Sequence, residues 1–280
     1  MVDPIFFPGG DIGHLAVNGT VNDLCMSGAR PKYLSAAFIL EEGLPLEDLS
    51  RIVQSMKEAA FAAGVRIITG DTKVVNRGKA DKLFINTAGI GVIEHDLTIS
   101  PTSLKPGDSV LVSGPIANHG LAILSQREGL AFESPIKSDT MALNALVADL
   151  VAELGPGLHA MRDPTRGGVA AVLQEFAEVA KVGIRLDEGA LPLDPAVAGA
   201  CEILGLDPLH IANEGKLIAV VSPGQVQAAL DIMRCHRYGA GAAVIGLVHD
   251  QSSGLVTLRT RLGAERIVDM PVGEQLPRIC

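Results

Sequence analysis

Apolar residues follow two alternating spacings along this chain, one typical of helices and one typical of strands. Residues 45–63 carry apolar side chains at three- and four-residue intervals, between Pro45 and Gly64, which predicts an amphipathic helix. The apolar runs LSAAFIL (34–40) and VRIIT (65–69) flank this helix and predict strands. A further run, KLFINTAGIGVI (82–93), predicts a buried strand.

The second half of the chain repeats this alternation. Short apolar runs at 110–114, 216–221, 242–248 and 255–260 predict strands, and helices are expected near 140–153, after Arg166-Gly167-Gly168, and over 225–235. The polar stretch 94–108 separates the two halves. We expect an α+β (mixed α/β) fold of two domains, residues 1–100 and 101–270, each a sheet covered by helices on one side, followed by a flexible tail at 271–280.

Composition and charge exclude several classes of partner. The chain has 23 basic and 32 acidic residues, a net charge of -9, no Trp, and only 3% aromatic residues. Without a basic block or stacking aromatics, a nucleic-acid partner has no physical basis. No apolar run approaches the roughly 20 residues that span a bilayer, and the start lacks the pattern of a secretory leader. We expect a cytoplasmic protein with no membrane partner.

The four cysteines lie far apart, and one of them, Cys280, is the last residue. Their spacing supports neither a disulfide framework nor a structural zinc site. Fully extended, residues 271–280 reach about 33 Å, which exceeds the roughly 19 Å radius of gyration of a compact chain of this size. The tail is therefore long enough to deliver the Cys280 thiol to a site on its own or a neighbouring subunit. A frayed terminus that happens to end in Cys is the alternative.

Two segments in the first half have the composition of a phosphate and metal site. FFPGGDIGHLAVNGTVNDLCMSGA (6–29) combines five glycines with two aspartates, Asp11 and Asp23, and carboxylates after glycines can hold Mg²⁺ beside phosphate oxygens. Asp71-Thr72-Lys73 follows the predicted strand 65–69, where loops of open sheets bind ligands. A glycine-rich turn with solvated carboxylates and an ordinary surface loop are the alternatives. Neither segment matches a standard phosphate-binding loop or dinucleotide fingerprint.

Two segments in the second half add charged groups. Asp163-Pro164-Thr165-Arg166-Gly167-Gly168 leads into a predicted helix, so an arginine and a helix N-terminus together form a candidate anion site. Helix capping by Asp163 or Thr165, with Arg166 in an ion pair, explains the same residues. Glu214 precedes the strand at 216–221, where it is either an acid or base of the reaction or a solvated side chain.

The motifs FFPGGDIG, NGTVNDL, GDTKVV, FINTAGIG, DPTRGG, ANEGK and the terminal PRIC resemble the HypE family of hydrogenase maturation factors, the carbamoyl dehydratases. This family lies within the superfamily of aminoimidazole ribonucleotide synthetase and selenophosphate synthetase. The resemblance implies that ATP phosphorylates a carboxamide carried by the thiol of Cys280 and that loss of phosphate leaves a thiocyanate. It also implies that this cyanide supplies the [NiFe] hydrogenase site.

The resemblance further implies roles for individual residues and partners. Asp23 and Asp71 bind Mg²⁺, Lys73 stabilises the γ-phosphate or the carboxamide oxygen, and Glu214 acts as the base. The remaining implied ATP-binding residues are Thr72, Arg166, Gly167 and Gly168. The implied partners are a second copy of the chain in a homodimer through the first-domain sheets, the carbamoyltransferase HypF, and the HypC-HypD iron-scaffold complex.

One departure and two alternatives accompany this resemblance. Members of the family carry, before the segment that matches Met1, a glycine-rich stretch and a Thr-Asp-Ser strand with another metal-binding aspartate, so we expect residues 1–280 to be an N-terminally truncated form that binds ATP weakly and turns over slowly. A synthetase of the same superfamily acting on a free small molecule would share the ATP site without needing Cys280. A non-catalytic cyanide carrier or scaffold would need no ATP.

Overall fold

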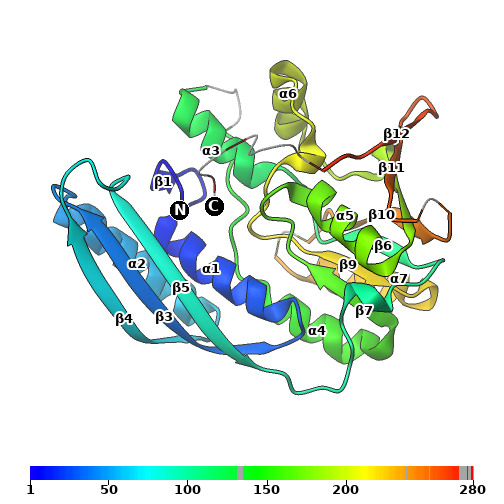
Figure 1. Ribbon diagram of the computed structural model, residues 1–280, viewed down its shortest axis with the longest axis horizontal. Helices are drawn as coiled ribbons and strands as arrows, with labels where there is room; N and C mark the ends of the chain where they lie inside the picture. The colour runs from blue at the N-terminus through cyan, green and yellow to red at the C-terminus, as the bar shows by residue number, and fades with distance from the viewer. Residues whose placement is uncertain (131–134, 238, 252, 271–275, 277–278, 280) are drawn as a thin grey trace.

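The structure is a computed structural model that describes residues 1–280 apart from 131–134, 238, 252, 271–275, 277–278 and 280. Figure 1 shows a three-stranded sheet on one side of the molecule and a seven-stranded sheet on the other, with helix α1 (Ile12–Cys25) between them. A two-stranded hairpin, β1 (Phe6–Phe7) with β2 (Gly10–Asp11), leads into α1. The mixed α/β fold built on two sheets confirms the fold class expected from the sequence.

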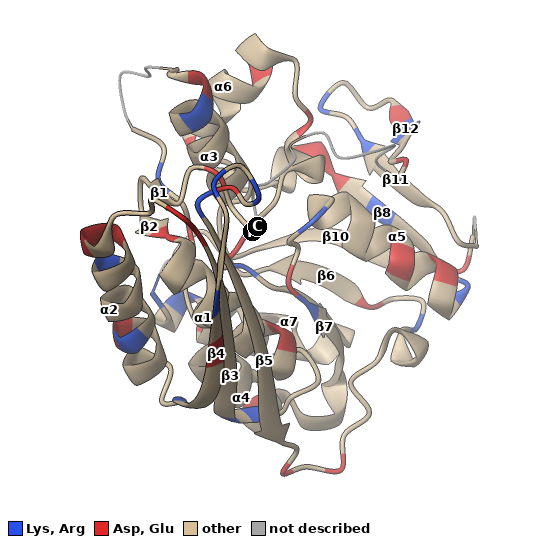
Figure 2. Cartoon of the chain, turned by 60° about the vertical axis from the view of Figure 1, so that its left-hand side comes forward, with Lys and Arg blue, Asp and Glu red and all other residues tan. Residues whose placement is uncertain are grey.

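The three-stranded sheet belongs to the first half of the chain. Strand β3 (Arg30–Glu41) lies between parallel β4 (Arg66–Val75) and antiparallel β5 (Leu83–Val92). Helices α1 and α2 (Leu46–Ala62) pack on one face of this sheet and against each other. The opposite face stays exposed, and Figure 2 shows that β5 carries no charged residue along its length.

Helix α2 confirms the helix predicted from the apolar spacing at 45–63. Its buried face contains Ile52, Met56 and Ala60, which follow one another at a four-residue spacing and share one side of the helix. Helix α1 crosses α2 closely at Gly13, where an added Cβ would lie 2.4 Å from Ser55 Oγ. A side chain at this glycine would therefore force the two helices apart.

The strands of the first sheet differ from the sequence predictions in two respects. The segment Asp71-Thr72-Lys73 was expected in a loop after a short strand, but β4 continues through it to Val75 because each residue stays paired with β3. Strand β5 was expected to be buried, yet only Leu83 is buried, and the rest of the strand is half-buried or exposed. Helices cover only one face of this sheet, which explains the exposure of β5, whereas pairing with β3 explains the length of β4.

The seven-stranded sheet contains the strands of the second half in the order β12-β11-β8-β10-β6-β9-β7. Its strands are β6 (Ser109–Val112), β7 (Leu158–Arg162), β8 (Gly183–Asp187), β9 (Ile218–Val221), β10 (Ala243–His249), β11 (Val256–Arg259) and β12 (Glu265–Ile267). Its helices are α3 (Asn118–Glu128), α4 (Asn144–Leu154), α5 (Gly168–Ala180), α6 (Pro195–Leu204) and α7 (Val226–Cys235). Single 3-10 turns occupy Pro101–Ser103, Gly155–Gly157, Glu188–Ala190, Pro208–His210 and Pro223–Gln225.

Both faces of this second sheet are covered, which corrects the expectation of helices on one side. Leu111 and Ala219 belong to the core cluster that includes residues of α4 and α7. Their neighbours Val110 and Val220 belong to a separate cluster that includes residues of α5. Successive residues of a strand point to opposite faces, so helices pack against each face of the sheet.

The cores of the two halves are continuous. Val17 and Ile52 from the first half share one core cluster with Leu146, Leu217 and Met233 from the second half. The polar stretch at 94–108 therefore separates two sheets that remain packed through α1 and α4. Among the described residues, no helix has both the length and the apolar character needed to cross a membrane.

Candidate active site

A cavity of about 250 Å³ lies where α1, β5 and the loops before α5 and β9 meet. Three carboxylates line it, those of Asp23, Asp163 and Glu214, together with Arg166. Its other lining residues are Met1, Ile12, Leu15, Ala16, Gly19, Thr20, Ile85, Asn86, Thr87 and Thr165. Three residues that the sequence predicts for the site, Asp23, Arg166 and Glu214, therefore come together from three separate motifs.

A buried asparagine in α1 holds one wall of the cavity. Asn22 Nδ2 donates to the carbonyl oxygens of Met141 at 3.0 Å and of Glu214 at 3.2 Å, and Asn22 Oδ1 accepts from the backbone N–H of Leu143 at 2.8 Å. Asn22 is 1% exposed, so the loss of these bonds would leave polar groups unpaired in the interior. This anchor places the adjacent Asp23 in the cavity.

A second buried asparagine joins the loops that carry the other site residues. Asn213 Nδ2 donates to the carbonyl oxygens of Pro164 at 3.1 Å and of Ile211 at 3.0 Å, while its Oδ1 accepts from the backbone N–H of Ala117 at 2.8 Å. The ANEGK motif is thereby tied to the DPTRGG motif and to the start of α3. These bonds explain why Asp163 and Glu214 face the same cavity.

Burial raises the pKa values of the carboxylates in the cavity, and neighbouring carboxylates raise two of them further. Burial, reinforced by Asp139 and by the charges of Asp163 and Asp23, raises the pKa of Glu214 well above its ordinary value. Burial and then Asp23 raise the pKa of Asp163 to about 6. Burial also raises the pKa of Asp23, although the charge of Arg162 partly opposes this rise. Glu214 is therefore a stronger base than an exposed glutamate.

The positive side of the cavity lies at the start of α5. Arg166 lines the cavity, Gly167 caps the helix with a left-handed backbone at φ 74°, and Gly168 is the first helical residue. Backbone N–H groups at a helix N-terminus favour an anion. Gly167 and Gly168 do not themselves line the cavity, so their contribution is to the position of Arg166 and the helix end.

Asp71, Thr72 and Lys73 do not line this cavity. All three are exposed on β4, and Asp71 and Thr72 line a wider groove of about 930 Å³ between β4 and α2. The strand register nevertheless connects the two places, because Asp71 pairs with Ala37, and Ala37 pairs with Asn86 at the cavity. Two strand spacings amount to about 10 Å. The backbones of Asn86 and Asp71 are therefore about 10 Å apart.

The donor set of the cavity is suited to a hard cation. Carboxylate oxygens are preferred ligands of Mg²⁺. Burial raises the pKa of both Asp23 and Asp163, and the charge of Asp23 adds to the rise at Asp163, so a cation placed here would stabilise both carboxylates. No group of three or more His, Cys, Asp or Glu side chains within the described residues is arranged to hold a metal by itself. A cation here would need ligands from a bound phosphate as well.

A buried ion pair behind Glu214 was missed by the sequence reasoning. Lys216 Nζ donates to Asp139 Oδ2 at 3.1 Å, and the backbone N–H of Glu214 donates to Asp139 Oδ1 at 3.1 Å. Burial pushes the pKa of Asp139 upward, but the Lys216 charge, His119 and these hydrogen bonds outweigh it, so the pKa is lowered. Lys216 is the last residue of the ANEGK motif, and its place in that motif was the only feature of the sequence that pointed to this ion pair.

The remaining predicted site residue, Cys280, lies outside the described residues. Its neighbour Ile279 is described and is 7% exposed. The ring of His119, at the start of α3, donates from Nε2 to the Ile279 carbonyl oxygen at 2.5 Å. Of the other three cysteines, Cys25 and Cys201 are buried and Cys235 is exposed, and none of them lines the cavity.

The sequence matches two family models. The model "AIR synthase related protein, N-terminal domain" matches residues 1–93, and "AIR synthase related protein, C-terminal domain" matches residues 105–259. A curated relative, "Carbamoyl dehydratase HypE" from Rhizobium leguminosarum bv. viciae, is 56% identical over 280 residues, which is 100% of this chain and 80% of that relative.

Two solved structures are similar to this one. A crystal structure of hydrogenase maturation protein HypE in complex with ATP has a TM-score of 0.96 and 52% sequence identity, and the match covers 100% of this chain and 84% of that chain. A chain of the crystal structure of a HypE-HypF complex has a TM-score of 0.93 and 54% identity, with 96% of this chain and 88% of that chain covered. The chain therefore belongs to the HypE family of carbamoyl dehydratases, within the AIR synthase related proteins.

Proposed function

We propose that this chain uses ATP to dehydrate a carbamoyl group on the thiol of its own Cys280, leaving a thiocyanate whose cyanide is used in [NiFe] hydrogenase assembly. One observation carries the proposal. The buried, high-pKa carboxyl of Glu214 lines a cavity with Asp23 and Arg166, and its loop packs beside the helix start that holds Ile279, the residue before Cys280.

The reaction needs phosphate transfer and proton removal at the same site. The γ-phosphate of ATP is transferred to the carboxamide oxygen, which forms an imidate phosphate and ADP. Breaking the C–O bond then releases inorganic phosphate and forms the C≡N bond, and the two N–H protons leave with the phosphate and the base. Hydroxide is a poor leaving group and phosphate is a good one, so ATP makes the dehydration possible.

Glu214 is the proposed base for the nitrogen-bound protons. Its raised pKa makes the Glu214 carboxylate a stronger proton acceptor than the carboxylate of an ordinary glutamate. The Asp139 side chain, which accepts from the Glu214 backbone N–H, fixes the loop behind it. A buried base held by backbone contacts needs little reorganisation when the substrate is in place.

The nucleotide phosphates are proposed to lie between Asp23, Arg166 and the exposed strand β4. Lys73 on this strand stabilises the γ-phosphate or the carboxamide oxygen, and Gly167 and Gly168 set the position of Arg166 and of the α5 N-terminus beside the anion. Asp71 lies at the end of the row that runs through Ala37 and Asn86, and Thr72 is the next residue of β4. The ATP complex of a 52% identical HypE supports nucleotide binding on this scaffold.

Mg²⁺ is proposed to bind together with ATP and to neutralise phosphate charge. Asp23 and Asp71 are the proposed protein ligands, with phosphate oxygens and water completing the coordination. Mg²⁺ is usually held by one or two carboxylates plus substrate phosphates. The crowded carboxylates of the cavity fit this role because they supply hard oxygen donors whose mutual repulsion a cation reduces.

The partners proposed for this chain are a second copy of itself, a carbamoyltransferase and an iron scaffold. The exposed face of the three-stranded sheet presents apolar side chains, among them Tyr33, Ile39 and Ile90, which a homodimer would bury. HypF is the proposed carbamoyl donor, supported by the complex of HypE with HypF in a similar structure. The HypC-HypD complex is the proposed acceptor of the cyanide.

Mass spectrometry of the C-terminal peptide tests the proposed function. The chain is incubated with the carbamoyl donor system and then with ATP and Mg²⁺. We expect a carbamoyl adduct on Cys280 that loses the mass of water only when ATP is present, and Cys280→Ser should carry neither adduct. Cys235→Ser is the matched control, because that exposed cysteine lies away from the cavity.

The outcomes of this experiment separate the competing functions. An unmodified Cys280 together with ATP turnover on a free small molecule would indicate a synthetase of the same superfamily. A carbamoylated or cyanated thiol without any ATP consumption would indicate a carrier or scaffold. Either result would overturn the proposed dehydration.

A further inference from the structure

The described residues near the C-terminus pack against the start of helix α3. Ile279 and Leu276 both contact the core cluster that joins the two sheets. Gly120, one residue after His119, is close to this tail, since a Cβ added to Gly120 would lie 3.5 Å from Leu276 Cδ1. The last part of the chain therefore has a defined seat between α3 and the core.

His119 makes the polar contact in this seat, and its hydrogen bonds define its tautomer. Nε2 bonds to the Ile279 carbonyl oxygen, which can only accept, so Nε2 carries the proton. Burial lowers the pKa of His119, so the ring is neutral near neutral pH and Nδ1 is an acceptor. Nδ1 then accepts a hydrogen bond from the Ser138 hydroxyl at 2.8 Å, and Ser138 Oγ accepts one from the Thr140 backbone N–H at 3.1 Å.

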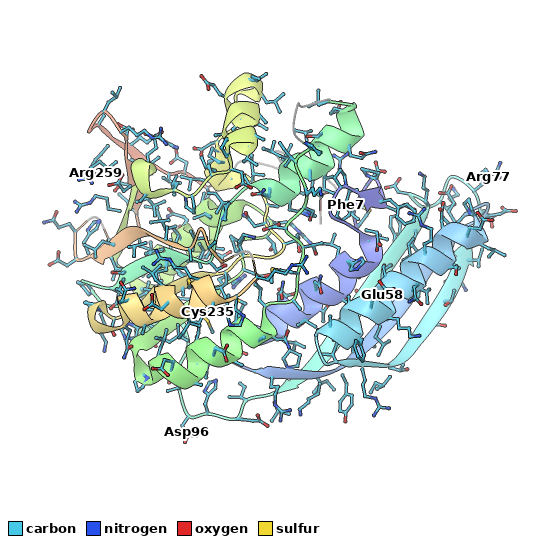
Figure 3. All side chains as sticks on the ribbon, turned by 180° about the vertical axis from the view of Figure 1, so that it is seen from behind. Phe7, Glu58, Arg77, Asp96, Cys235 and Arg259 are labelled. Atoms are coloured by element: carbon cyan, nitrogen blue, oxygen red, sulfur yellow. The ribbon has the colours of Figure 1, made fainter. Side chains whose placement is uncertain are left out.

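The His119 ring has little freedom to turn away from the tail. The ring of Phe7 packs edge-on against it, with ring centroids 5.6 Å apart and an interplanar angle of 90°. Figure 3 labels Phe7, which comes from the glycine-rich segment that leads into α1. His119 itself is fully buried. Ser138 on one side and Phe7 on the other therefore hold the Nε2–H bond in one direction.

The same contacts connect the tail seat to the proposed base. Gly120 donates its backbone N–H to the carbonyl oxygen of Ala212 at 3.1 Å, two residues before Glu214. A Cβ at Gly120 would lie 2.5 Å from Ile211 Cγ2, so only glycine permits this approach. On the other side, Ser138 precedes Asp139, whose Oδ1 accepts from the Glu214 backbone N–H. The residue before Cys280 and the loop of Glu214 thus share one rigid support.

We infer that His119 is a positioning residue for the reaction, which seats the peptide carbonyl of Ile279 and so presents the modified Cys280 to the site that contains Glu214. This inference rests on the proposed function. A tethered substrate has high effective concentration, but a tail that samples many positions is seldom oriented for reaction. A single buried hydrogen bond beside the reacting residue removes most of this freedom.

The first measurement follows tail docking without any chemistry. Carboxypeptidase digestion of the whole chain, followed by mass spectrometry, reports how often the seat around Ile279 opens. We expect His119→Phe, which keeps a buried ring but loses the donor, to release the residues before Cys280 roughly three- to tenfold faster, as the net value of one hydrogen bond implies. His119→Gln retains an N–H donor and should restore most of the protection.

The second measurement follows the reaction itself. Single-turnover conversion of carbamoylated Cys280 is measured at several ATP concentrations. We expect His119→Phe to slow the conversion by roughly the same factor at saturating ATP, while the ATP concentration for half-maximal rate stays unchanged. His119→Gln should recover the rate. Ile279→Ala keeps the carbonyl oxygen but removes the buried side chain that packs the tail, so it should change both measurements in the same direction.

The control is Ser125→Ala on the same helix, because Ser125 Oγ bonds only to the Leu121 carbonyl oxygen of α3. The inference is overturned if His119→Phe and Ile279→Ala match the unmodified chain in both measurements, or if both His119 variants lose rate and thermal stability equally. A faster reaction in His119→Phe would also overturn it, since the seat would then store the tail away from the site. If the unmodified chain forms no thiocyanate, the proposed function fails, and the digestion rates still decide whether His119 holds the tail.

Discussion

The carboxylate cavity and the outer face of the three-stranded sheet carry the predicted chemistry in opposite environments. In the cavity, Asp163 and Glu214 are buried, and Asp23 lies at the exposed edge. Partial or full burial raises the pKa of all three, and like charges add to the rise for Asp163 and Glu214. On the sheet, Asp71 and Lys73 project from a strand that no helix covers on its outer side. The motifs singled out in the sequence thus lie in two places, a cavity inside the molecule and an open sheet face.

This difference indicates which part of the site the chain completes by itself. The cavity is fixed by buried asparagines and by an ion pair, so its geometry is set once the chain folds. The sheet face exposes apolar side chains beside its charged residues. We therefore expect substitutions in the cavity to change the reaction rate or the pH dependence of stability, and substitutions on the face to change assembly.

The largest effect is expected from Glu214→Gln in the cavity. Removing the proposed base should lower the rate of thiocyanate formation by roughly 10² to 10⁴, the usual contribution of general base catalysis. The nearly isosteric amide also removes a buried carboxyl that its neighbours disfavour as an anion, so the free energy of unfolding should not fall. Single-turnover mass spectrometry and urea denaturation measure the two quantities.

The matched control is Glu153→Gln, because Glu153 is exposed on α4, away from the cavity. Its rate and unfolding free energy should stay close to those of the unmodified chain. If Glu214→Gln keeps its rate, Glu214 is not the base, and the cavity can no longer be distinguished from the sheet face as the place of proton removal.

A pH-dependent effect of intermediate size is expected from Asp163→Asn. The pKa of Asp163 is about 6 in the folded chain against an ordinary 3.8, so the folded state holds this proton more tightly than the unfolded state. The stability from this proton is full below about pH 4 and is lost as the pH rises through 6. About two pKa units correspond to roughly 3 kcal/mol.

The measurement is the difference in unfolding free energy between Asp163→Asn and the unmodified chain, by urea denaturation with a chelator present. The variant should gain relative stability as the pH rises from about 4 to about 7, because it has no proton to lose. Asp96→Asn, at the exposed residue labelled in Figure 3, is the control and should show no such trend. A flat difference for Asp163→Asn would mean that the cavity does not destabilise its carboxylates.

The smallest effect on stability is expected on the sheet face. Ile90 is 66% exposed on β5, so Ile90→Glu should change the unfolding free energy of a single subunit by no more than about 0.5 kcal/mol. In a homodimer built on this face, the same charge would be buried without a partner and should separate the subunits. Light scattering measures the mass, and Leu262→Glu, on a 98% exposed residue of the second domain, is the control. An unchanged mass would place the dimer elsewhere.

Local pattern was sufficient where a segment's structure depends on its own residues. The apolar spacing of 45–63 predicted α2, because one helix face is set by residues three and four apart. The strand ending near Gly70 was predicted wrongly, because a strand continues as long as a neighbour pairs with it, and β3 continues to Glu41. Asp163 was considered only as a cap, because burial beside Asp23 does not show in its local sequence.

The sequence by itself determined the mixed α/β class, the helix and strand types of its strongest segments, and the motifs that contain Asp23, Arg166, Glu214 and Cys280. Tertiary structure alone decided that Asp23, Asp163 and Glu214 share a cavity, that Asp71 and Lys73 do not line it, and that His119 holds Ile279. The physical reason is the separation in sequence of the residues that interact. Helix and strand periodicity is a property of neighbouring residues, whereas burial, charge coupling and a hydrogen bond across 160 positions of sequence exist only after the chain has packed.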